Sequence, residues 1–149
     1  MITVIDSCTW IDAMVAGGVE EAAITRAFSL GVIAGCDSLW NENEWVLTRK
    51  YDFPPKLVAE DLALYRMFSV NVSIDGSVRG CTDPDDDFIL ECAVRSGARV
   101  IVSNDRKHLV SMRSYEFIPI LTPEQFLFTP YAVAGDDVVR EYALLFGTL

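Results

Sequence analysis

Hydrophobic positions fall into short continuous runs that predict strands and longer periodic segments that predict helices. The strand-like runs are rich in β-branched residues and comprise residues 2–6, 32–36, 70–74, 99–103 and 117–121. The helix-like segments carry apolar residues three or four positions apart and comprise residues 17–31, 37–51, 53–68, 83–96 and 122–127. Because the two kinds of segment alternate, we expect an α/β domain with a mainly parallel sheet.

Capping and turn residues mark the ends of these elements. Ser38 is predicted to cap the second helix-like segment, and Gly97 to end the fourth. In the third segment, Leu57 and Leu62 are expected to face the core. Pro119 lies inside the last strand-like run, and proline cannot donate a ladder hydrogen bond, so this strand is expected at a sheet edge.

The pattern of core positions ends near Phe128, so we expect one domain over residues 1–129. The tail, residues 130–149, contains "DDVVREYALLFGTL", which is typical of an amphipathic helix. Two roles stay open for this tail, namely packing against the domain and pairing with another chain.

Composition narrows the class of protein. No apolar run approaches the roughly 18 residues of a membrane span, and the N-terminus has no basic leader, so we expect a cytoplasmic protein. Four cysteines without a CxxC pair, and a single histidine, leave no zinc-ligand set, so the thiols are expected to be reduced and buried as small apolar groups. The net charge of −10 argues against a broad phosphate-binding surface, unless a divalent cation offsets the acids locally.

The densest charge lies in the segment "DPDDD", residues 83–87, directly before an apolar helix. Asp83 followed by Pro84 is a good helix start, and acids in the first turn suit the helix dipole. Capping accounts for one or two of these carboxylates, but each further one repels its neighbours. Asp85 and Asp87 are expected to face solvent.

Acids that are far apart in the sequence are predicted to meet at one edge of the sheet. Asp6 ends the first strand-like run, and Asp105 follows the fourth. Asp86 begins a helix that starts at the same edge, and Glu44 lies in the helix after the second strand. Ligand sites in open parallel sheets form outside the carboxyl ends of the strands. A hard cation such as Mg²⁺ or Mn²⁺ would relieve the repulsion among these acids and would suit phosphodiester hydrolysis.

The segments that carry these acids, together with one further segment near residue 123, show a family resemblance. In chain order they are "VIDSCTWI", "DSLWNENEWVLTRKYDF", "CTDPDDDFILECAVRSGARVIVSNDRKHL" and "ILTPEQFL". They resemble the PIN-domain family, in particular the toxin branch of toxin–antitoxin systems, the VapC-like ribonucleases. The third segment is the most specific, and together they cover residues 1 to about 128. The resemblance implies a three-layer α/β/α fold with a parallel sheet of about five strands.

The resemblance also implies site residues, cofactor and partners. The acids that bind metal in the family fall on Asp6, Glu44, Asp86 and Asp105. The supporting positions fall on Ser7, Asp83 and Ser103. The implied activity is endonucleolytic cleavage of single-stranded RNA with Mg²⁺ or Mn²⁺, and in the toxin branch a small antitoxin protein blocks it. Family members often form homodimers, so a homodimer is expected here.

Two positions depart from the family pattern or compete with it. Cys8 stands where the family usually has an asparagine that supports the site by hydrogen bonding, and a thiol is a weaker hydrogen-bonding group. Activity or metal affinity is therefore expected to be lower. Glu42 competes with Glu44, but the two lie on different faces of one helix, so only one should point inward, and the resemblance favours Glu44.

Several other residues near the acids allow two interpretations each. His108 is expected to border the short turn after Asp105 rather than to act as a general base. Arg106 and Lys107 lie in the same turn, where phosphate contact and simple exposure are equally open. Trp40 is expected to pack in the core, whereas base stacking is open for Trp45.

The sequence therefore predicts a metal-dependent endoribonuclease in which a metal-activated water attacks the phosphodiester. The alternative is a catalytically silent PIN-like module that binds RNA or protein, which Cys8 and the high acidity favour. A phosphatase with an aspartate nucleophile is disfavoured, because that class would have a second aspartate two residues after Asp6.

Overall fold

A computed structural model gives the fold of the protein, and it describes residues 1–130. The C-terminal segment that the sequence predicts as an amphipathic helix lies outside the described residues.

A central sheet of six strands runs in the order β3-β2-β1-β4-β6-β5. The strands are β1 (Ile2–Ile5), β2 (Val32–Gly35), β3 (Val70–Asn71), β4 (Val100–Val102), β5 (Ser114–Tyr115) and β6 (Ile118–Leu121). Neighbouring strands pair in parallel, except that β5 pairs antiparallel with β6. The prediction of an α/β domain with a mainly parallel sheet is confirmed.

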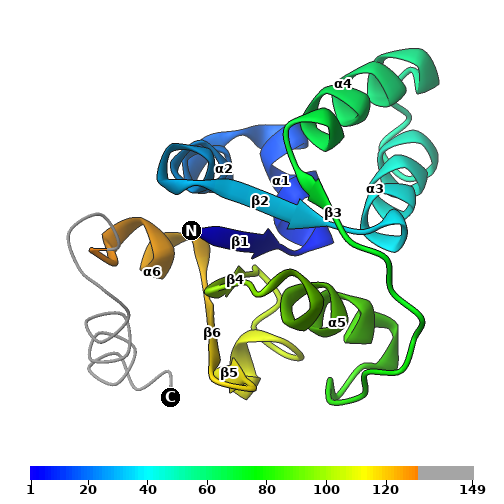
Figure 1. The fold of residues 1–149 in the computed structure, drawn as a ribbon. Coiled ribbons are helices and arrows are strands. Elements are labelled where there is room, and N and C mark those ends of the chain that lie inside the picture. Colours follow the sequence, from blue (N-terminus) through cyan, green and yellow to red (C-terminus); the bar gives the residue numbers. More distant parts are fainter. Residues whose placement is uncertain (131–149) are drawn as a thin grey trace.

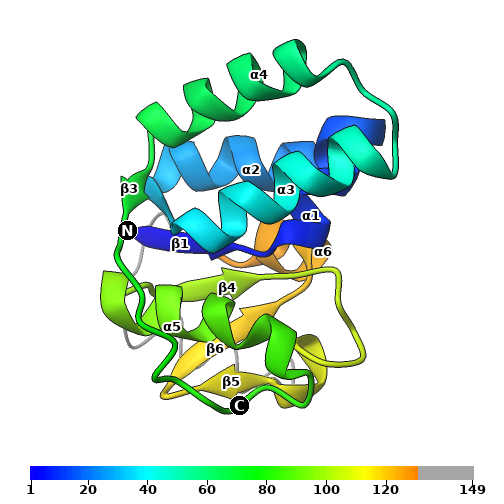
Figure 2. The same cartoon turned by 90° about the vertical axis from the view of Figure 1, so that its right-hand side faces the viewer.

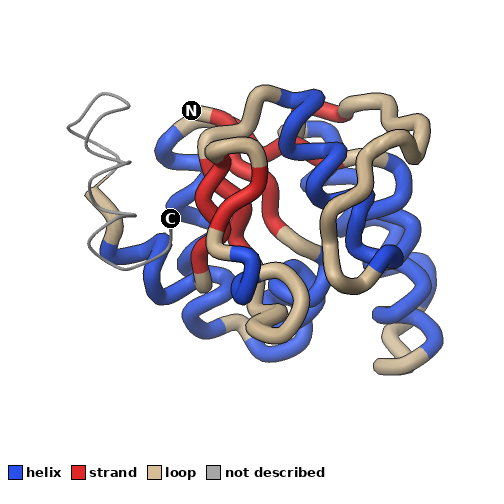
Figure 3. The backbone as a smooth tube through the Cα atoms, turned by 90° about the horizontal axis from the view of Figure 1, so that it is seen from below, coloured by secondary structure: helices blue, strands red, loops and turns tan. Residues whose placement is uncertain are grey.

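Helices cover both faces of this sheet. They are α1 (Ser7–Ala16), α2 (Gly18–Leu30), α3 (Asp37–Arg49), α4 (Pro55–Met67), α5 (Asp87–Ser96) and α6 (Pro123–Phe128), with short 3₁₀ helices η1 (Pro84–Asp86) and η2 (Val110–Met112). Figures 1 and 2 show α1 to α4 on one side of β1 and α5 on the other, and Figure 3 shows the strands enclosed by helices. The arrangement is the expected three-layer α/β/α fold. Among the described residues, no helix is long and apolar enough to cross a membrane.

Helix α1 is an element that the hydrophobic pattern did not predict. It begins directly after β1 and buries Trp10 completely, while Cys8 and Thr9, which are poor helix formers, lie in its first turn. The Trp10 ring packs edge-on against the rings of Trp40 and Tyr65, at centroid distances of 5.5 and 4.9 Å. Tertiary packing around this ring therefore outweighs the weak local helix preference.

Three local predictions were wrong. Helix α3 begins at Asp37, so Cys36 and not Ser38 is the N-cap residue, because the chain turns immediately after β2. Leu57 is 55% exposed, since α4 is an outer helix that buries only a narrow stripe. Pro119 is not at the sheet edge, because a two-residue turn folds the short strand β5 back onto β6 and pairs Ser114 with Pro119.

The order of the strands reverses beside β1. The chain proceeds outward from β1 to β2 and β3, and then returns to place β4 on the other side of β1. The register sets Ile5 opposite Val102, so both strands end at the same level. This is the topological switch point at which open α/β sheets form ligand sites.

A long connection, residues 72–82, which we call the β3–α5 loop, lies along α5 and is held by a buried carboxylate. Glu91 is 1% exposed, and its two oxygens accept the backbone N–H groups of Asp75 at 2.8 Å and Gly76 at 2.9 Å. The Nε–H of Arg95 also donates to Glu91 at 2.7 Å. Each oxygen of this buried carboxylate therefore has a donor, as burial of a charge requires.

Asp87 holds the same loop one turn earlier on α5. It is 6% exposed, and its Oδ1 accepts the N–H groups of Gly80 at 3.0 Å and Cys81 at 2.9 Å. The expectation that Asp87 faces solvent was therefore wrong, because its side chain points to the loop that covers α5. Asp85, by contrast, is exposed as expected.

We expect Glu91→Ala to destabilise the protein by about 2–3 kcal/mol, because it leaves two loop N–H groups without their acceptor and removes one of the two carboxylates with which Arg95 pairs. The measurement is the free energy of unfolding from urea titration. Glu60→Ala is the matched control, because Glu60 also pairs with a basic residue one helical turn away, Lys56, but is exposed. This substitution should lower the free energy of unfolding by less than about 0.5 kcal/mol. Equal effects of the two substitutions would contradict the role given to Glu91.

Candidate functional site

Asp6 lies at the switch point and is the most buried acid of the candidate site. It follows the last residue of β1, its backbone N–H donates to the Val102 carbonyl at 2.9 Å, and the residue is 3% exposed. Its Oδ2 accepts hydrogen bonds from Ser103 Oγ at 2.7 Å and from Cys8 Sγ at 2.8 Å. Burial raises the pKa of Asp6 above its usual range, against the effect of these donors.

Ser103 links Asp6 to Asp105 across the two central strands. It is fully buried, and while its hydroxyl donates to Asp6 the same oxygen accepts the backbone N–H of Asp105 at 2.9 Å. The Oδ1 of Asp105 in turn accepts the N–H groups of Lys107 and His108, each at 2.9 Å. One side of each carboxylate is therefore occupied by protein donors, which fixes its orientation.

Asp86 joins this pair from the start of α5. It is partly buried in η1, and its pKa is raised to about 7, first by burial and then by the charges of Asp6, Asp105, Asp83 and Glu42. The charges of Asp6 and Asp105 therefore act on Asp86, as expected for acids near one edge of the sheet. Asp83 also accepts the N–H of Asp85 at 3.1 Å, so it caps η1 in addition to adding charge.

On α3, the charge of Glu42 acts on the other acids, as the smallest of the named effects on each. Its charge contributes to the raised pKa of both Asp6 and Asp86. Residues two apart on a helix lie on different faces, and Asn43 between the two glutamates is fully buried. The structure thus favours Glu42 where the resemblance favoured Glu44, and a role for Glu44 stays a prediction.

Cys8 supports the site more directly than the sequence suggested. The thiol donates to the same oxygen of Asp6 as Ser103 does, and the pKa of Cys8 is raised, mainly by burial and then by the charge of Asp6. The thiol therefore keeps its proton and acts as a hydrogen-bond donor. All four cysteines are free, as expected.

Asn104 is a structural residue that the sequence analysis did not single out. Its Nδ2 donates to Asp12 at 2.8 Å and to Glu20 at 2.9 Å, and its backbone N–H donates to Thr9 Oγ1 at 2.9 Å. These bonds hold the segment that carries Asp105 against α1 and α2. A lone asparagine beside an acid gives no signal in the sequence, because its partners are about 84 to 95 residues away.

The residues after Asp105 border the acids. The Nδ1 of His108 lies 3.1 Å from Thr82 Oγ1, which agrees with a bordering role for this histidine. Arg106 is exposed and lies 3.9 Å from Glu124, and Lys107 is exposed.

The two tryptophans of α3 differ in exposure. Trp40 is buried as expected, whereas Trp45 is 55% exposed.

The donor set suits a hard divalent cation, although the acids are not gathered as a closed cage. Within residues 1–130, no group of three or more His, Cys, Asp or Glu side chains is placed to hold a metal ion. Mg²⁺ commonly binds through one or two carboxylates, waters and substrate phosphate, so it needs no such cage. Ser7, next to Asp6, and Asn43, next to Glu42, also have buried polar atoms without a partner among the described residues. Buried polar groups rarely lack a partner, so these atoms fit a site that takes up water or an ion.

Comparison with known proteins finds a family match. The model of the PIN domain family matches residues 3–107, which is more than half of the chain. The matched segment contains Asp6, Glu42, Asp86 and Asp105. No curated protein matches the chain.

Removal of the repelling charge at Asp86 should stabilise the metal-free protein at high pH. Because the folded protein raises the pKa of Asp86 from 3.8 to about 7, it binds a proton that the unfolded chain has lost, and stability falls as the pH rises through this window. The full shift corresponds to about 4 kcal/mol, and solvent screening of this partly buried carboxylate reduces it to roughly 1 kcal/mol. Asp86→Asn should therefore melt about 3 °C above the wild type at pH 8.

The measurement is thermal melting in chelator at pH 4 and pH 8. At pH 4 the two proteins should melt together, because Asp86 is then protonated in the folded state. Asp85→Asn serves as the control, since Asp85 is exposed and adjacent, and it should change little at either pH. A large loss of stability in Asp86→Asn would show that this carboxylate has a structural role instead.

Proposed function

The chain belongs to the PIN domain family, and we propose that it is a Mg²⁺- or Mn²⁺-dependent endoribonuclease. PIN domains are generally nucleases and generally use divalent metals. The observation that carries the proposal is the pair Asp6 and Asp105, which Ser103 links at the switch point of the sheet, with Asp86 near enough that their charges add to the effect of burial in raising its pKa to about 7. Such mutual repulsion is costly in a structural role and useful in a cation site.

The residues of the cluster would have different roles in cation binding. Asp6, Asp86 and Asp105 would hold the cation, with Glu42 as a further ligand, either directly or through water. Ser103 and Cys8 hold one oxygen of Asp6, which leaves its other oxygen for the cation. A bound Mg²⁺ or Mn²⁺ would activate water and offset the charge on the phosphate oxygens.

Asp86 makes cation binding dependent on pH. With a pKa of about 7, its carboxyl group is partly protonated at neutral pH in the metal-free protein. A cation must displace this proton, so binding should strengthen as the pH rises through neutrality.

We further propose that the ribonuclease is the toxin of a toxin–antitoxin system, acts as a homodimer on single-stranded RNA in the cytoplasm, and is blocked by an antitoxin protein. These points rest on the resemblance of its four segments to the VapC-like branch.

A binding module without catalysis is the second candidate. It is favoured by Cys8, which stands where the family usually has an asparagine, and by the net charge of −10. Such a protein would bind RNA or another protein through the same fold and would show no cleavage with any metal.

Cleavage of a mixed-sequence single-stranded RNA decides between these two functions. We expect cleavage by the wild type with Mn²⁺ or Mg²⁺, none with chelator, and a loss of at least about 100-fold in Asp6→Asn, which removes a charge from the centre of the cluster. Cleavage that survives Asp6→Asn would indicate a contaminating nuclease. RNA binding without cleavage under every metal would favour the binding module.

The two glutamates of α3 provide a matched pair for the site assignment. We expect Glu42→Gln to weaken Mn²⁺ binding by roughly 10-fold or more and to lower cleavage, because the charge of Glu42 acts on Asp6 and Asp86. Glu44→Gln should leave both nearly unchanged. Calorimetric titration of Mn²⁺ measures the affinity independently of catalysis, and the reverse ranking would restore Glu44 as the site residue.

A further inference from the structure

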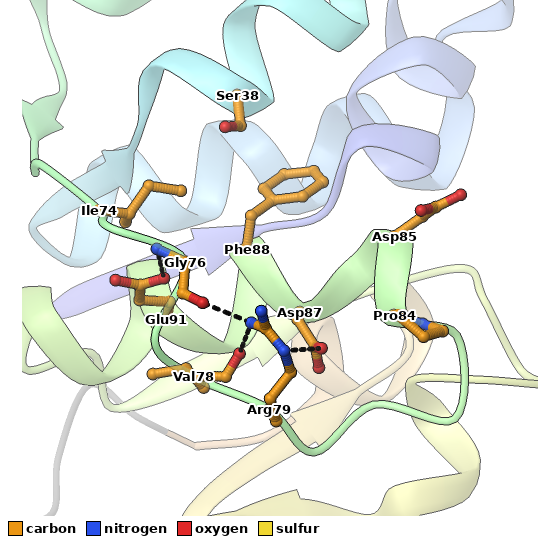
Figure 4. A pocket seen from close by; sticks show the side chains of 10 residues that line it. All are labelled: Ser38, Ile74, Gly76, Val78, Arg79, Pro84, Asp85, Asp87, Phe88 and Glu91. Atoms are coloured by element: carbon orange, nitrogen blue, oxygen red, sulfur yellow. Dashed lines mark hydrogen bonds and ion pairs between the residues drawn. The ribbon is translucent and has the colours of Figure 1, made fainter.

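An open pocket of about 410 Å³ lies between the start of α3, the β3–α5 loop and the start of α5. Its apolar wall comes from Ile74, Val78 and Phe88, and its polar lining includes Ser38 and Arg79. Figure 4 shows the Phe88 ring standing out from α5 into the space below Ser38 and beside Ile74. The volume lies within the range of pockets that bind small ligands, and it exceeds that of a single nucleobase.

The pocket adjoins the acid cluster along α3 and lies on another side of α5 from Asp86. Phe88 follows Asp86 by two residues, so the ring and the carboxylate leave the start of α5 on different sides. Ser38 and Glu42 are four residues apart on α3 and therefore lie on the same face, about 6 Å apart along the helix axis. A phosphate at the acids and a base in the pocket would thus be about one helical turn apart.

Hydrogen-bond donors surround the two buried carboxylates of the pocket. The pocket therefore repels an anionic strand less strongly than two free carboxylates would. Asp87 and Glu91 each accept two backbone N–H groups of the β3–α5 loop. The Nε of Arg79 lies 4.0 Å from Asp87, and the guanidinium also donates to the carbonyls of Gly76 and Val78. Arg79 is thus held in the lining by its own loop, while most of its side chain stays exposed.

The charge of the protein favours an aromatic contact over a purely electrostatic one. A net charge of −10 opposes the attraction to phosphates on which non-specific nucleic-acid binding usually depends. Stacking of a base on an aromatic ring does not require positive charge, and it is the main alternative source of affinity for single strands.

We propose that this pocket binds a nucleobase, stacked on the Phe88 ring, from the nucleotide next to the phosphodiester held at the acid cluster. The inference rests on the proposed ribonuclease function, because that function supplies the strand. It adds a base subsite that the acid cluster does not contain, and it assigns Phe88 as a residue that contacts substrate.

Binding of a fluorescein-labelled 12-nucleotide RNA of mixed sequence, measured by anisotropy with Mn²⁺ present, tests the subsite without catalysis. The parent protein is the full chain with Asp6→Asn, so that no cleavage occurs. Phe88→Leu keeps an apolar side chain but removes the ring, and Phe88→Tyr restores a ring. Phe128→Leu is the control, because Phe128 is 77% exposed on α6, which lies far from α3 and α5 in Figure 1.

We expect Phe88→Leu to weaken RNA binding at least about 5-fold, the effect of losing one stacked base. Phe88→Tyr should bind as the parent does, and Phe128→Leu should have no effect. A labelled strand of the same length without bases should not distinguish Phe88→Leu from the parent. Thermal melting confirms that each variant is folded.

Three outcomes would overturn the proposal. In the first, Phe88→Leu binds RNA as tightly as the parent does. In the second, the parent binds the strand without bases as tightly as the RNA. In the third, the parent does not bind RNA. Ring-dependent binding in a protein that never cleaves RNA would keep the base subsite and reject the nuclease, so the two proposals can fail separately.

Discussion

The hydrogen bond from Ser103 to the buried carboxylate of Asp6 is the contact on which the candidate site depends. It joins the carboxyl ends of β1 and β4, the two strands between which the sheet reverses its order. The same serine oxygen accepts the N–H of Asp105, so one hydroxyl sets the positions of two acids. Parallel pairing then keeps both acids at one level, because the register sets Ile5 opposite Val102.

Repulsion between carboxylates is the cost of this arrangement. Burial and four neighbouring acids raise the pKa of Asp86 to about 7, and burial raises that of Asp6. A fold selected for stability alone would gain from replacing these acids by neutral residues. The retained repulsion is what a divalent cation would relieve, which is why the electrostatics support a cation site even though the described acids form no closed cage.

Three consecutive aspartates, residues 85–87, have different roles because their surroundings in the fold differ. Asp85 is exposed, Asp86 faces the other acids, and Asp87 is buried against the β3–α5 loop, where it accepts two backbone N–H groups. The helix period turns each side chain about 100° from the last. Consequently one residue contributes charge to the site, and its neighbour holds the loop that forms the adjoining pocket.

The sequence by itself determined the α/β class, the alternation of strands and helices, and the position of Asp6 and Asp105 at the carboxyl ends of neighbouring strands, where Ser103 links them. Local periodicity and the parallel topology that it implies suffice for those conclusions. The tertiary structure alone decided that α1 forms, that Asp87 is buried and that Glu42 acts on the other acids. Each of these depends on contacts between residues distant in the chain, such as the packing of Trp10 on Trp40 and Tyr65. Side-chain direction is a property of the packed fold, and local sequence does not contain it.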